Sequence, residues 1–376
     1  MTFTELGLCA PVQQAVRESG YDSPTPIQQQ AIPVVLEGKD IFGCAQTGTG
    51  KTAAFALPIL HDLHVNGADR RYPSVVILAP TRELAAQIGE SIQQYGKHLR
   101  IRSLTVFGGA SINMQTRALQ RGVQIVIATP GRLNDLLERG AINLSRVHTL
   151  VLDEADRMLD MGFMPQIKSV IKNIPTQRQT LMFSATIPPE IKKLADSILN
   201  EPVHVSVAPV SSTTALVSQR RYIVPKESKR ALLLHLLNSD VSGQVLIFAR
   251  TRRGADRLTK DIQRAGIPVA ALHGDKSQSA RESALRAFKR GVNRVLVATD
   301  IASRGIDITQ LPYVINFDLP DSPETYVHRI GRTGRADFAG DALTISTPEE
   351  ERDIRQIERV TKSRMPIVRD HPFVNG

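Results

Sequence analysis

The stretch that decides the fold is Ala45-Gln46-Thr47-Gly48-Thr49-Gly50-Lys51-Thr52. It follows a short apolar run at residues 40–44 and leads into an apolar helical pattern at residues 53–57. A strand, a glycine-rich turn and a helix in this order are the context of a phosphate-binding loop. The glycines let successive N–H groups point at one anion, and the positive end of the helix adds to the attraction. We expect a nucleotide phosphate site here, although Ala45 stands where the pattern usually has a glycine; a turn that binds nothing is the alternative.

Side chains with the chemistry of nucleotide hydrolysis occur here and further along the chain. Lys51 supplies a charge for the β- and γ-phosphates, and Thr52 supplies a hydroxyl for the metal ion that bridges them. Asp153-Glu154-Ala155-Asp156 follows an apolar run, and an Asp at such a strand end organises magnesium in nucleotide-binding sheets. Glu154 could take the proton from an attacking water, and Asp156 is expected to be a hydrogen-bonding link.

The composition is that of a globular protein with two domains. The chain has 376 residues, of which 41% are apolar and 22% charged. Its two cysteines, Cys9 and Cys44, cannot form a metal cluster by themselves and suit a reducing compartment. No run of about 18 apolar residues predicts a membrane span, and the N-terminus lacks the pattern of a secretion signal. We expect a cytoplasmic protein without a membrane partner.

The net charge of +10 is unevenly distributed. Residues 1–218 contain 20 basic and 18 acidic residues, a net charge of +2. The other 27 of the 47 basic residues and 19 of the 37 acidic residues lie after residue 218 and give the second half a net charge of +8. This excess favours a polyanion such as nucleic acid as a partner, with a solubilising surface as the alternative.

Short apolar runs alternate with helical patterns in both halves of the chain, which predicts parallel doubly wound sheets with ligands at the carboxyl ends of the strands. The linker is expected at residues 207–218, between domains at residues 1–206 and 219–376. Residues 77–82 are similar to residues 247–252, and residues 127–129 are similar to residues 297–299, both at an offset of 170 residues. This internal repeat predicts two related lobes. Strands are expected at residues 74–79, 103–107, 124–128, 149–152 and 179–183, and at 244–248, 269–272, 294–298, 313–316 and 342–346.

Three further groups of polar residues have both a structural and a functional interpretation. Gln28 begins a helix expected at residues 28–36. Its amide could pair with adenine while Tyr21 stacks on the base. Alternatively, the segment is only a structural connection before the first strand. Ser184-Ala185-Thr186 at a strand end is a turn or a relay from the γ-phosphate. Arg332 and Arg335, among glycines, could be arginine fingers or a solvated basic helix end.

Taken together, these motifs resemble those of the DEAD-box RNA helicases of helicase superfamily 2, and the resemblance covers nearly the whole chain. It looks most like the bacterial RhlE type. The motifs are the Q motif (Phe3, Gly20 and residues 24–28), residues 45–52, 80–85, 108–109, 129–132, 153–156, 184–186 and 246–250, Gln278 with Arg281, and residues 298–307 and 328–335.

The resemblance implies two RecA-like lobes joined by a flexible linker, with ATP and Mg²⁺ as ligands and RNA as partner. Gln28 would read adenine with Tyr21 nearby, residues 45–52 would hold the phosphates, and Asp307 would contact the ribose. Thr52 and Asp153 would hold magnesium; Lys51, Asp153, Glu154, Arg332 and Arg335 would be catalytic; and Asp156, Ser184 and Thr186 would couple hydrolysis to strand separation. RNA contacts would come from Pro80, Thr81, Arg82, Gly109, Thr129, Gly131, Arg132, Arg250, Gln278, Arg281 and Thr299.

The expected function is RNA-stimulated ATP hydrolysis that drives local, non-processive unwinding of short RNA duplexes or remodelling of RNA–protein complexes. An ATP-gated RNA clamp without significant unwinding is the alternative. A DNA helicase of the same superfamily and an inactive scaffold are further rivals. RNA binding is expected to be largely independent of sequence, because the contacts would be mainly to sugar and phosphate.

Overall fold

The computed structural model describes residues 2–44, 49–67, 69, 71–206, 217–303, 311–333 and 340–373. The chain divides into two compact units, Met1–Pro209 and Val210–Gly376. No helix among the described residues is long and apolar enough to cross a membrane.

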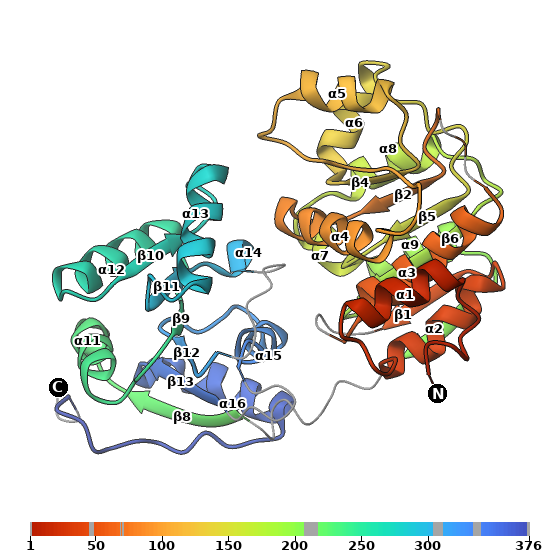
Figure 1. The fold of residues 1–376 in the computed structure, drawn as a ribbon. Helices are drawn as coiled ribbons and strands as arrows, with labels where there is room; N and C mark the ends of the chain where they lie inside the picture. Colours follow the sequence, from red (N-terminus) through yellow and green to blue (C-terminus); the bar gives the residue numbers. More distant parts are fainter. Residues whose placement is uncertain are drawn as a thin grey trace. The chain divides into compact units, whose positions relative to one another are not determined.

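The first unit is a parallel sheet with helices on both faces (Figure 1). Its described strands lie in the order β3-β4-β2-β5-β6-β1-β7, and every pairing between them is parallel. The strands are β1 Ile41–Cys44, β2 Val75–Leu78, β3 Ser103–Val106, β4 Ile125–Ala128, β5 Thr149–Leu152, β6 Gln179–Ser184 and β7 Val203–Ser206. The helices are α1 Ala10–Glu18, α2 Pro26–Leu36, α3 Lys51–Val65, α4 Arg82–Tyr95, α5 Ile112–Gln120, α6 Pro130–Glu138, α7 Ala155–Asp160, α8 Met164–Lys172 and α9 Pro189–Ile198.

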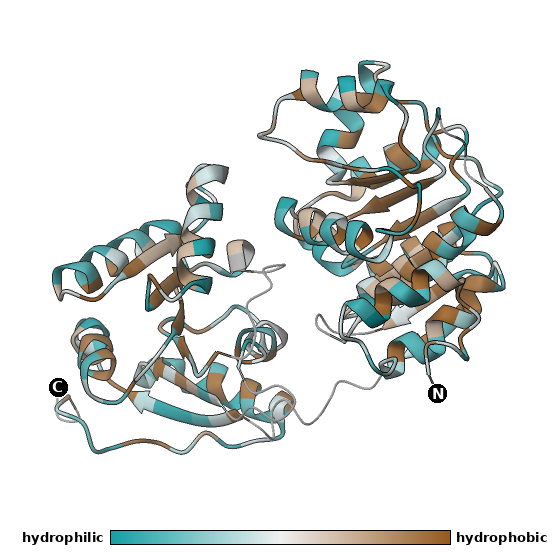
Figure 2. Cartoon of the chain, viewed as in Figure 1, coloured by the Kyte–Doolittle hydropathy of each residue, from teal (hydrophilic) through white to brown (hydrophobic). Residues whose placement is uncertain are grey.

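Alternation along the strands divides the core of this unit into two layers. Ile77 packs with α1 to α4 on one face of the sheet, whereas its neighbours Val76 and Leu78 pack with α5 to α9 on the other. Successive side chains of a strand point to opposite faces, so a continuous apolar run suits a strand that is covered on both sides. Figure 2 shows the strands of this unit in brown between helices whose outer faces are mostly teal.

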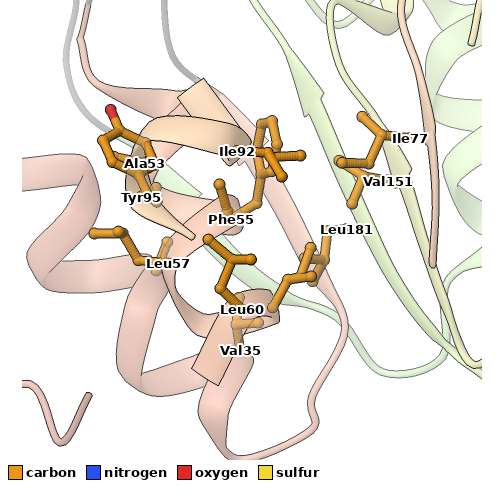
Figure 3. Packing of buried hydrophobic residues seen from close by; sticks show 14 of the residues in the cluster. Val35, Ala53, Phe55, Leu57, Leu60, Ile77, Ile92, Tyr95, Val151 and Leu181 are labelled. Atoms are coloured by element: carbon orange, nitrogen blue, oxygen red, sulfur yellow. The ribbon is translucent and has the colours of Figure 1, made fainter. Parts of the chain in front are cut away.

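The helix that follows the phosphate-loop sequence is fixed in this core. Phe55 and Leu57 of α3 pack with Ile92 and Tyr95 of α4 against Leu181 of β6 (Figure 3). The ring centroids of Phe55 and Phe183 lie 5.7 Å apart. Close packing of this kind resists small displacements, so the beginning of α3 is held rigidly at the end of the sheet.

The second unit repeats the same plan. Its described strands lie in the order β10-β11-β9-β12-β13-β8, again with only parallel pairings. The strands are β8 Val217–Ile223, β9 Val245–Phe248, β10 Val269–Leu272, β11 Val295–Ala298, β12 Tyr313–Asn316 and β13 Gly340–Ser346. The helices are α11 Lys229–Ser239, α12 Arg252–Arg264, α13 Gln278–Lys289, α14 Asp300–Ser303, α15 Pro323–Ile330 and α16 Glu351–Thr361, with short 3₁₀ turns η1 Lys226–Ser228 and η2 Pro348–Glu350.

The internal repeat in the sequence corresponds to equivalent strands of the two sheets. β2 and β9 occupy the same place in the strand order, as do β4 and β11, and each pair is offset by 170 residues. β8 takes the place of β1, but η1 follows it instead of a glycine-rich turn and a helix like α3. The prediction of two α/β lobes with parallel sheets is confirmed.

Three local predictions differ from the structure. Strand β7 is absent from the predicted set, and β8 begins at Val217, so the last two residues of the predicted linker are part of a strand. Both are edge strands that are absent from the predicted set: β7 alternates apolar and polar residues over only four positions, and β8 has four consecutive polar residues at 218–221, so both resemble a polar connection. Helix α2 begins at Pro26, two residues before the predicted start, because a proline at the first position needs no N–H partner.

Gly43 of β1 offers a test of how tightly the core is packed. A Cβ at this position would lie 2.5 Å from the ring of the buried Phe183. We expect Gly43→Ala to destabilise the protein by about 1–3 kcal/mol through overpacking. Urea unfolding of the full chain, followed by circular dichroism, measures the change.

Gly131 of α6 is the matched control, because nothing lies within 4 Å of a Cβ there. In Gly131→Ala the better helix propensity of alanine should leave stability unchanged or raise it by up to about 1 kcal/mol. Equal midpoints for Gly43→Ala and the wild type would contradict the packing argument.

Candidate active site and nucleic-acid interface

The predicted site residues of the first unit lie at the carboxyl edge of its sheet. β6 lies between β5 and β1, so Asp153 after β5, Ser184 at the end of β6 and Cys44 at the end of β1 are neighbours. Pro80 follows β2, and Thr129 follows β4 on the other side of the sheet. The edge therefore divides into a half over β1, β6 and β5, called the nucleotide half because it carries residues predicted to bind a nucleotide, and a second half over β2, β4 and β3.

Gln28 is connected to the end of the phosphate loop. Its Oε1 accepts a hydrogen bond from the Thr25 backbone N–H at 3.0 Å, and its Nε2 donates to the Gly50 carbonyl at 3.1 Å. Gly50 has a φ of +92°, and a Cβ there would lie 2.5 Å from Gln28 Nε2. Only glycine fits both the backbone and the space. The amide keeps one further donor and one lone pair for a ligand.

Lys51 and Asp153 form a buried pair with incomplete bonding. Lys51 Nζ lies 3.8 Å from Asp153 Oδ1, and their side chains are only 5% and 3% exposed. Among the described residues, neither of these two atoms has a hydrogen-bond partner. Burial raises the pKa of Asp153 to about 6, with Lys51 acting in the opposite direction. Two buried groups of opposite charge, each with a charged atom that lacks a hydrogen-bond partner, are suited to an anion and a cation as ligands.

A phosphate and a magnesium ion match this donor set. Lys51 offers an ammonium group to phosphate oxygens, while Thr52 in the first turn of α3 and Asp153 offer the oxygen ligands that Mg²⁺ prefers. The described residues contain no group of three or more His, Cys, Asp and Glu side chains that could hold a metal ion. Magnesium typically binds through one or two protein ligands together with substrate phosphates, so the residues present fit it.

Glu154 is held in an unusual conformation next to a buried arginine. Its φ is +54°, a left-handed value that costs a residue with a side chain about 1–3 kcal/mol. Arg157 Nη1 donates to Glu154 Oε2 at 2.9 Å, and both side chains are buried. The sequence analysis does not include Arg157, although its spacing of three residues from Glu154 is the signal of such a helical pair. Strain held in place by an ion pair is typical of a functional position.

Asp156 connects the segment after β5 with the turn after β6. Its Oδ2 accepts hydrogen bonds from the Ala185 N–H at 3.2 Å and from both the N–H and the hydroxyl of Thr186 at 2.8 Å. Ser184 Oγ accepts from the Asp156 N–H at 3.2 Å and donates to the Thr186 carbonyl at 2.7 Å. The turn after β6 is therefore bonded directly to the segment after β5.

Tyr21 lies beside Tyr95 of α4. The two hydroxyl oxygens are 3.5 Å apart, and the ring centroids are separated by 6.2 Å. The side chain of Tyr21 is 45% exposed, whereas Tyr95 is buried. One face of Tyr21 is thus packed, and the exposed part remains available to a base.

The other half of the edge is arranged around the loop after β3. Arg132 Nη1 donates to the Ala110 carbonyl at 3.0 Å and to Gln115 Oε1 at 3.1 Å. The Arg82 guanidinium lies over Gly109, whose φ is +84°, and a Cβ at Gly109 would overlap it. Two arginines from α4 and α6 therefore meet at one loop.

The remaining predicted contacts of this half lie at helix starts. Thr81 precedes α4, and its hydroxyl accepts from the Leu84 N–H at 3.2 Å. Thr129 precedes α6, with Gly131 exposed in the first turn, and Pro80 lies between β2 and Thr81. N–H groups at the beginning of a helix attract phosphates, so these positions suit a nucleic-acid backbone.

The second unit places its predicted contacts at the corresponding edge. Arg250 follows β9; its backbone N–H donates to Asp318 Oδ2 at 2.9 Å and its Nη2 to the Leu319 carbonyl at 3.1 Å. Thr299 follows β11, and Arg281 lies in the first turn of α13. Arg250 and Thr299 are at strand ends equivalent to those of Pro80 and Thr129 in the first unit.

Arg332 is buried and lies two residues after the end of α15. A different arginine holds this helix end in place. Arg329 binds Asp300 through Nε at 2.6 Å and Nη2 at 2.7 Å, and its Nη1 donates to Asn316 Oδ1 at 3.1 Å. Its guanidinium also lies 4.8 Å from the ring centroid of Phe248. The sequence analysis gave no separate role to Arg329, and a bidentate arginine at a buried site fixes the geometry of the helix end.

Several predicted positions lie outside the described residues. They are Ala45, Gln46, Thr47 and Gly48 of the phosphate loop, Asp307, Arg335 and the side chain of Gln278. Thr49 and Gly50, which end the loop, are described.

Comparison with known proteins adds independent evidence. Residues 25–194 match the family model of the DEAD/DEAH box helicases, and residues 228–337 match that of the helicase conserved C-terminal domain. The chain is 44% identical to the DEAD-box ATP-dependent RNA helicase CshA of Geobacillus kaustophilus over 97% of this chain and 77% of that protein. It is 42% identical to CshA of Bacillus subtilis over 98% of this chain and 74% of the relative.

Solved structures agree with the sequence relatives. Saccharomyces cerevisiae Dbp5 bound to RNA and ADP BeF3 matches with a TM-score of 0.86 and 31% identity, over 98% of this chain and 95% of that one. A DEAD box protein from Methanococcus jannaschii matches with a TM-score of 0.56 and 37% identity, over 98% and 99% of the two chains. The lobes are thus RecA-like, as expected.

The finer expectation of an RhlE-type protein is not supported, because the relatives named above are CshA proteins. The coarser assignment stands on both family models, on identity over nearly the whole chain and on the matching fold: this chain belongs to the family of DEAD-box ATP-dependent RNA helicases.

Proposed function

We propose that this protein hydrolyses ATP on the nucleotide half of its first unit and uses the cycle to separate short RNA duplexes locally or to remodel RNA–protein complexes. The observation that carries the proposal is the buried Lys51–Asp153 pair, whose charged atoms lack hydrogen-bond partners within the described part of the chain. Membership of the RNA helicase family supports ATP as the substrate and RNA as the partner.

In the proposed reaction, each residue at the nucleotide half has a separate task. Gln28 and Tyr21 bind the adenine, Lys51 holds the phosphates, and Thr52 and Asp153 hold Mg²⁺, which neutralises phosphate charge when it is bound. Glu154 accepts the proton of the attacking water, and Arg157 keeps the Glu154 carboxylate in place. Asp307 is proposed to contact the ribose.

The second unit contributes charge to the same reaction. We propose that Arg332 and Arg335 stabilise the negative charge that develops on the transferred phosphoryl group. Asp156 transmits the loss of the γ-phosphate through Ser184 and Thr186, because its carboxylate is bonded to their turn. ATP and RNA that both prefer one arrangement of the protein necessarily strengthen each other's binding.

RNA binding is proposed at the second half of the first edge and at the corresponding edge of the second unit. Arg82 and Arg132 at the loop after β3 offer guanidinium groups to phosphates, and Gly109 allows close approach of the backbone. The further contacts proposed are Pro80, Thr81, Thr129, Gly131, Arg250, Gln278, Arg281 and Thr299.

ATP hydrolysis measured with and without single-stranded RNA tests the function, with a DNA of the same sequence as control. We expect strong stimulation by RNA alone, since both ligands favour one state of the protein. Equal stimulation by DNA would favour a DNA helicase, and hydrolysis indifferent to both would contradict the proposal. A strand-separation assay with a short duplex then distinguishes the helicase from an ATP-gated clamp.

Glu154→Gln should keep the binding of ATP and RNA but reduce turnover by about 10²–10⁴-fold, because the amide cannot accept the proton. Its volume and its contact with Arg157 are largely retained. Steady-state hydrolysis and equilibrium binding of a fluorescent ATP analogue separate the two effects. Glu190→Gln, at an exposed position of α9, is the control. Normal turnover in Glu154→Gln would contradict the assignment of Glu154 as the proton acceptor.

Arg335→Ala should leave ATP binding by the first unit mostly intact and lower RNA-stimulated hydrolysis by about 10³-fold or more, which is the typical contribution of an arginine finger. The same hydrolysis and binding assays apply. Arg369→Ala, at an exposed position of the second unit, removes the same charge elsewhere. If stimulated turnover in Arg335→Ala equals that of this control, Arg335 has no role in the reaction.

A further inference from the structure

Helix α12 has a row of basic side chains on its outer surface. Arg253, Arg257, Lys260 and Arg264 are all exposed, and their spacing of four, three and four residues places them on one face of the helix. The buried residues Ala255, Leu258 and Ile262 lie on the opposite face. At about 1.5 Å per residue, this basic stripe is about 17 Å long.

Most of the stripe has no acidic partner. Among the described residues, Arg253, Arg257 and Lys260 have no ion pair and no side-chain hydrogen bond; Arg264 lies 3.5 Å from Asp261. The other aspartate of the helix, Asp256, binds His273 at 3.0 Å and Lys276 at 2.8 Å. Both aspartates of α12 thus bind side chains other than Arg253, Arg257 and Lys260, and the positive charge of these three residues remains available to a ligand.

The equivalent helix of the first unit shows that packing does not require this charge. α4 follows β2 as α12 follows β9, and Thr81 and Thr251 cap the two helices in the same way. The buried positions also correspond at the offset of 170, since Ala85, Ile88 and Ile92 match Ala255, Leu258 and Ile262. The four positions of the stripe are Glu83, Gln87, Glu90 and Gln94 in α4.

The position of the first basic residue is unfavourable for the helix itself. Arg253 lies in the first turn of α12, where the helix dipole favours negative charge. The same dipole, together with the N–H groups of the first turn, attracts a phosphate. A basic residue at this place therefore suits a bound polyanion better than it suits an isolated helix.

The stripe begins where the proposed RNA interface of the second unit ends. Arg250 lies three residues before Arg253, at the carboxyl end of β9. Figure 1 shows α12 running beside β10 on an outer side of the unit, and most of its surface is teal in Figure 2. A single strand bound at the edge would continue along the helix, with its phosphates next to the basic side chains.

From these observations we propose that the stripe on α12 is an additional RNA-binding site, which holds the sugar–phosphate backbone of the RNA segment flanking the strand at the sheet edges. The proposal rests on the proposed function, because the RNA must also bind at those edges. The site distinguishes RNA by length and not by sequence, since arginine and lysine contacts to phosphates carry no sequence information.

The test is the triple variant Arg253→Gln, Arg257→Gln, Lys260→Gln in the full chain, with binding of a 20-nucleotide and an 8-nucleotide oligouridylate measured at several salt concentrations. We expect the affinity for the longer RNA to fall about tenfold and its salt dependence to lose about two units of slope, at ~0.7 per phosphate contact. The shorter RNA, which fits within the edge, should bind nearly as before, and the maximal RNA-stimulated hydrolysis rate should not change.

Helix α16 supplies a matched control. Arg352→Gln, Arg355→Gln, Arg359→Gln removes the same charge at a similar spacing from exposed positions of the same unit, where Glu351 pairs with Arg355. If the two triple variants bind the longer RNA with equal affinity and equal salt slope, the proposal is overturned, and an acidic protein becomes the favoured partner of α12. Failure of the wild-type protein to bind either RNA would instead contradict the proposed function.

Discussion

The charges of Lys51 and Asp153 are the constraint on which the first unit depends. Removing both groups from water is costly, and their separation of 3.8 Å without a hydrogen bond compensates only in part. The surrounding structure keeps them in place: the packed α3 holds the lysine, and the buried β5 holds the aspartate. A protein that keeps two such groups buried is preorganised for a ligand that brings both a negative phosphate and a positive metal ion.

The parallel sheets explain how one edge can serve two ligands. Because all strands end on the same side, residues from distant parts of the chain meet there without long loops. In the first unit, β1, β5 and β6 present the nucleotide residues, while β2, β3 and β4 present arginines and helix starts. The second unit keeps the latter arrangement, but β8 is followed by η1 and α11 where β1 is followed by the phosphate-loop sequence.

The sequence predicts the central strands because residues such as Val75–Leu78 form uninterrupted apolar runs between clear turns. It misses β7 and β8, because an edge strand such as Val203–Ser206 buries only one side and has a polar pattern. The identity of the site residues follows from motifs, yet the motifs do not reveal how they are held. The contact of Gln28 with Gly50 and the pair of Glu154 with Arg157 depend on tertiary distances and on a left-handed backbone, which local propensity does not encode. The linker and the domain boundaries remain predictions.

The equivalence of strands at a constant offset has a consequence for the history of the molecule. Two copies of one ancestral lobe, joined in a single chain, need only one working phosphate loop between them. The copy that lacks the loop keeps only the residues proposed to complete the site of the other copy, and its remaining surface can diverge as long as its hydrophobic layers persist. The matched interiors and contrasting outer faces of α4 and α12 are what such a duplication would leave behind. Specialisation among related proteins is then expected to accumulate on the outer helices of the second copy, such as α12, where a substitution changes partners without touching the residues proposed for catalysis.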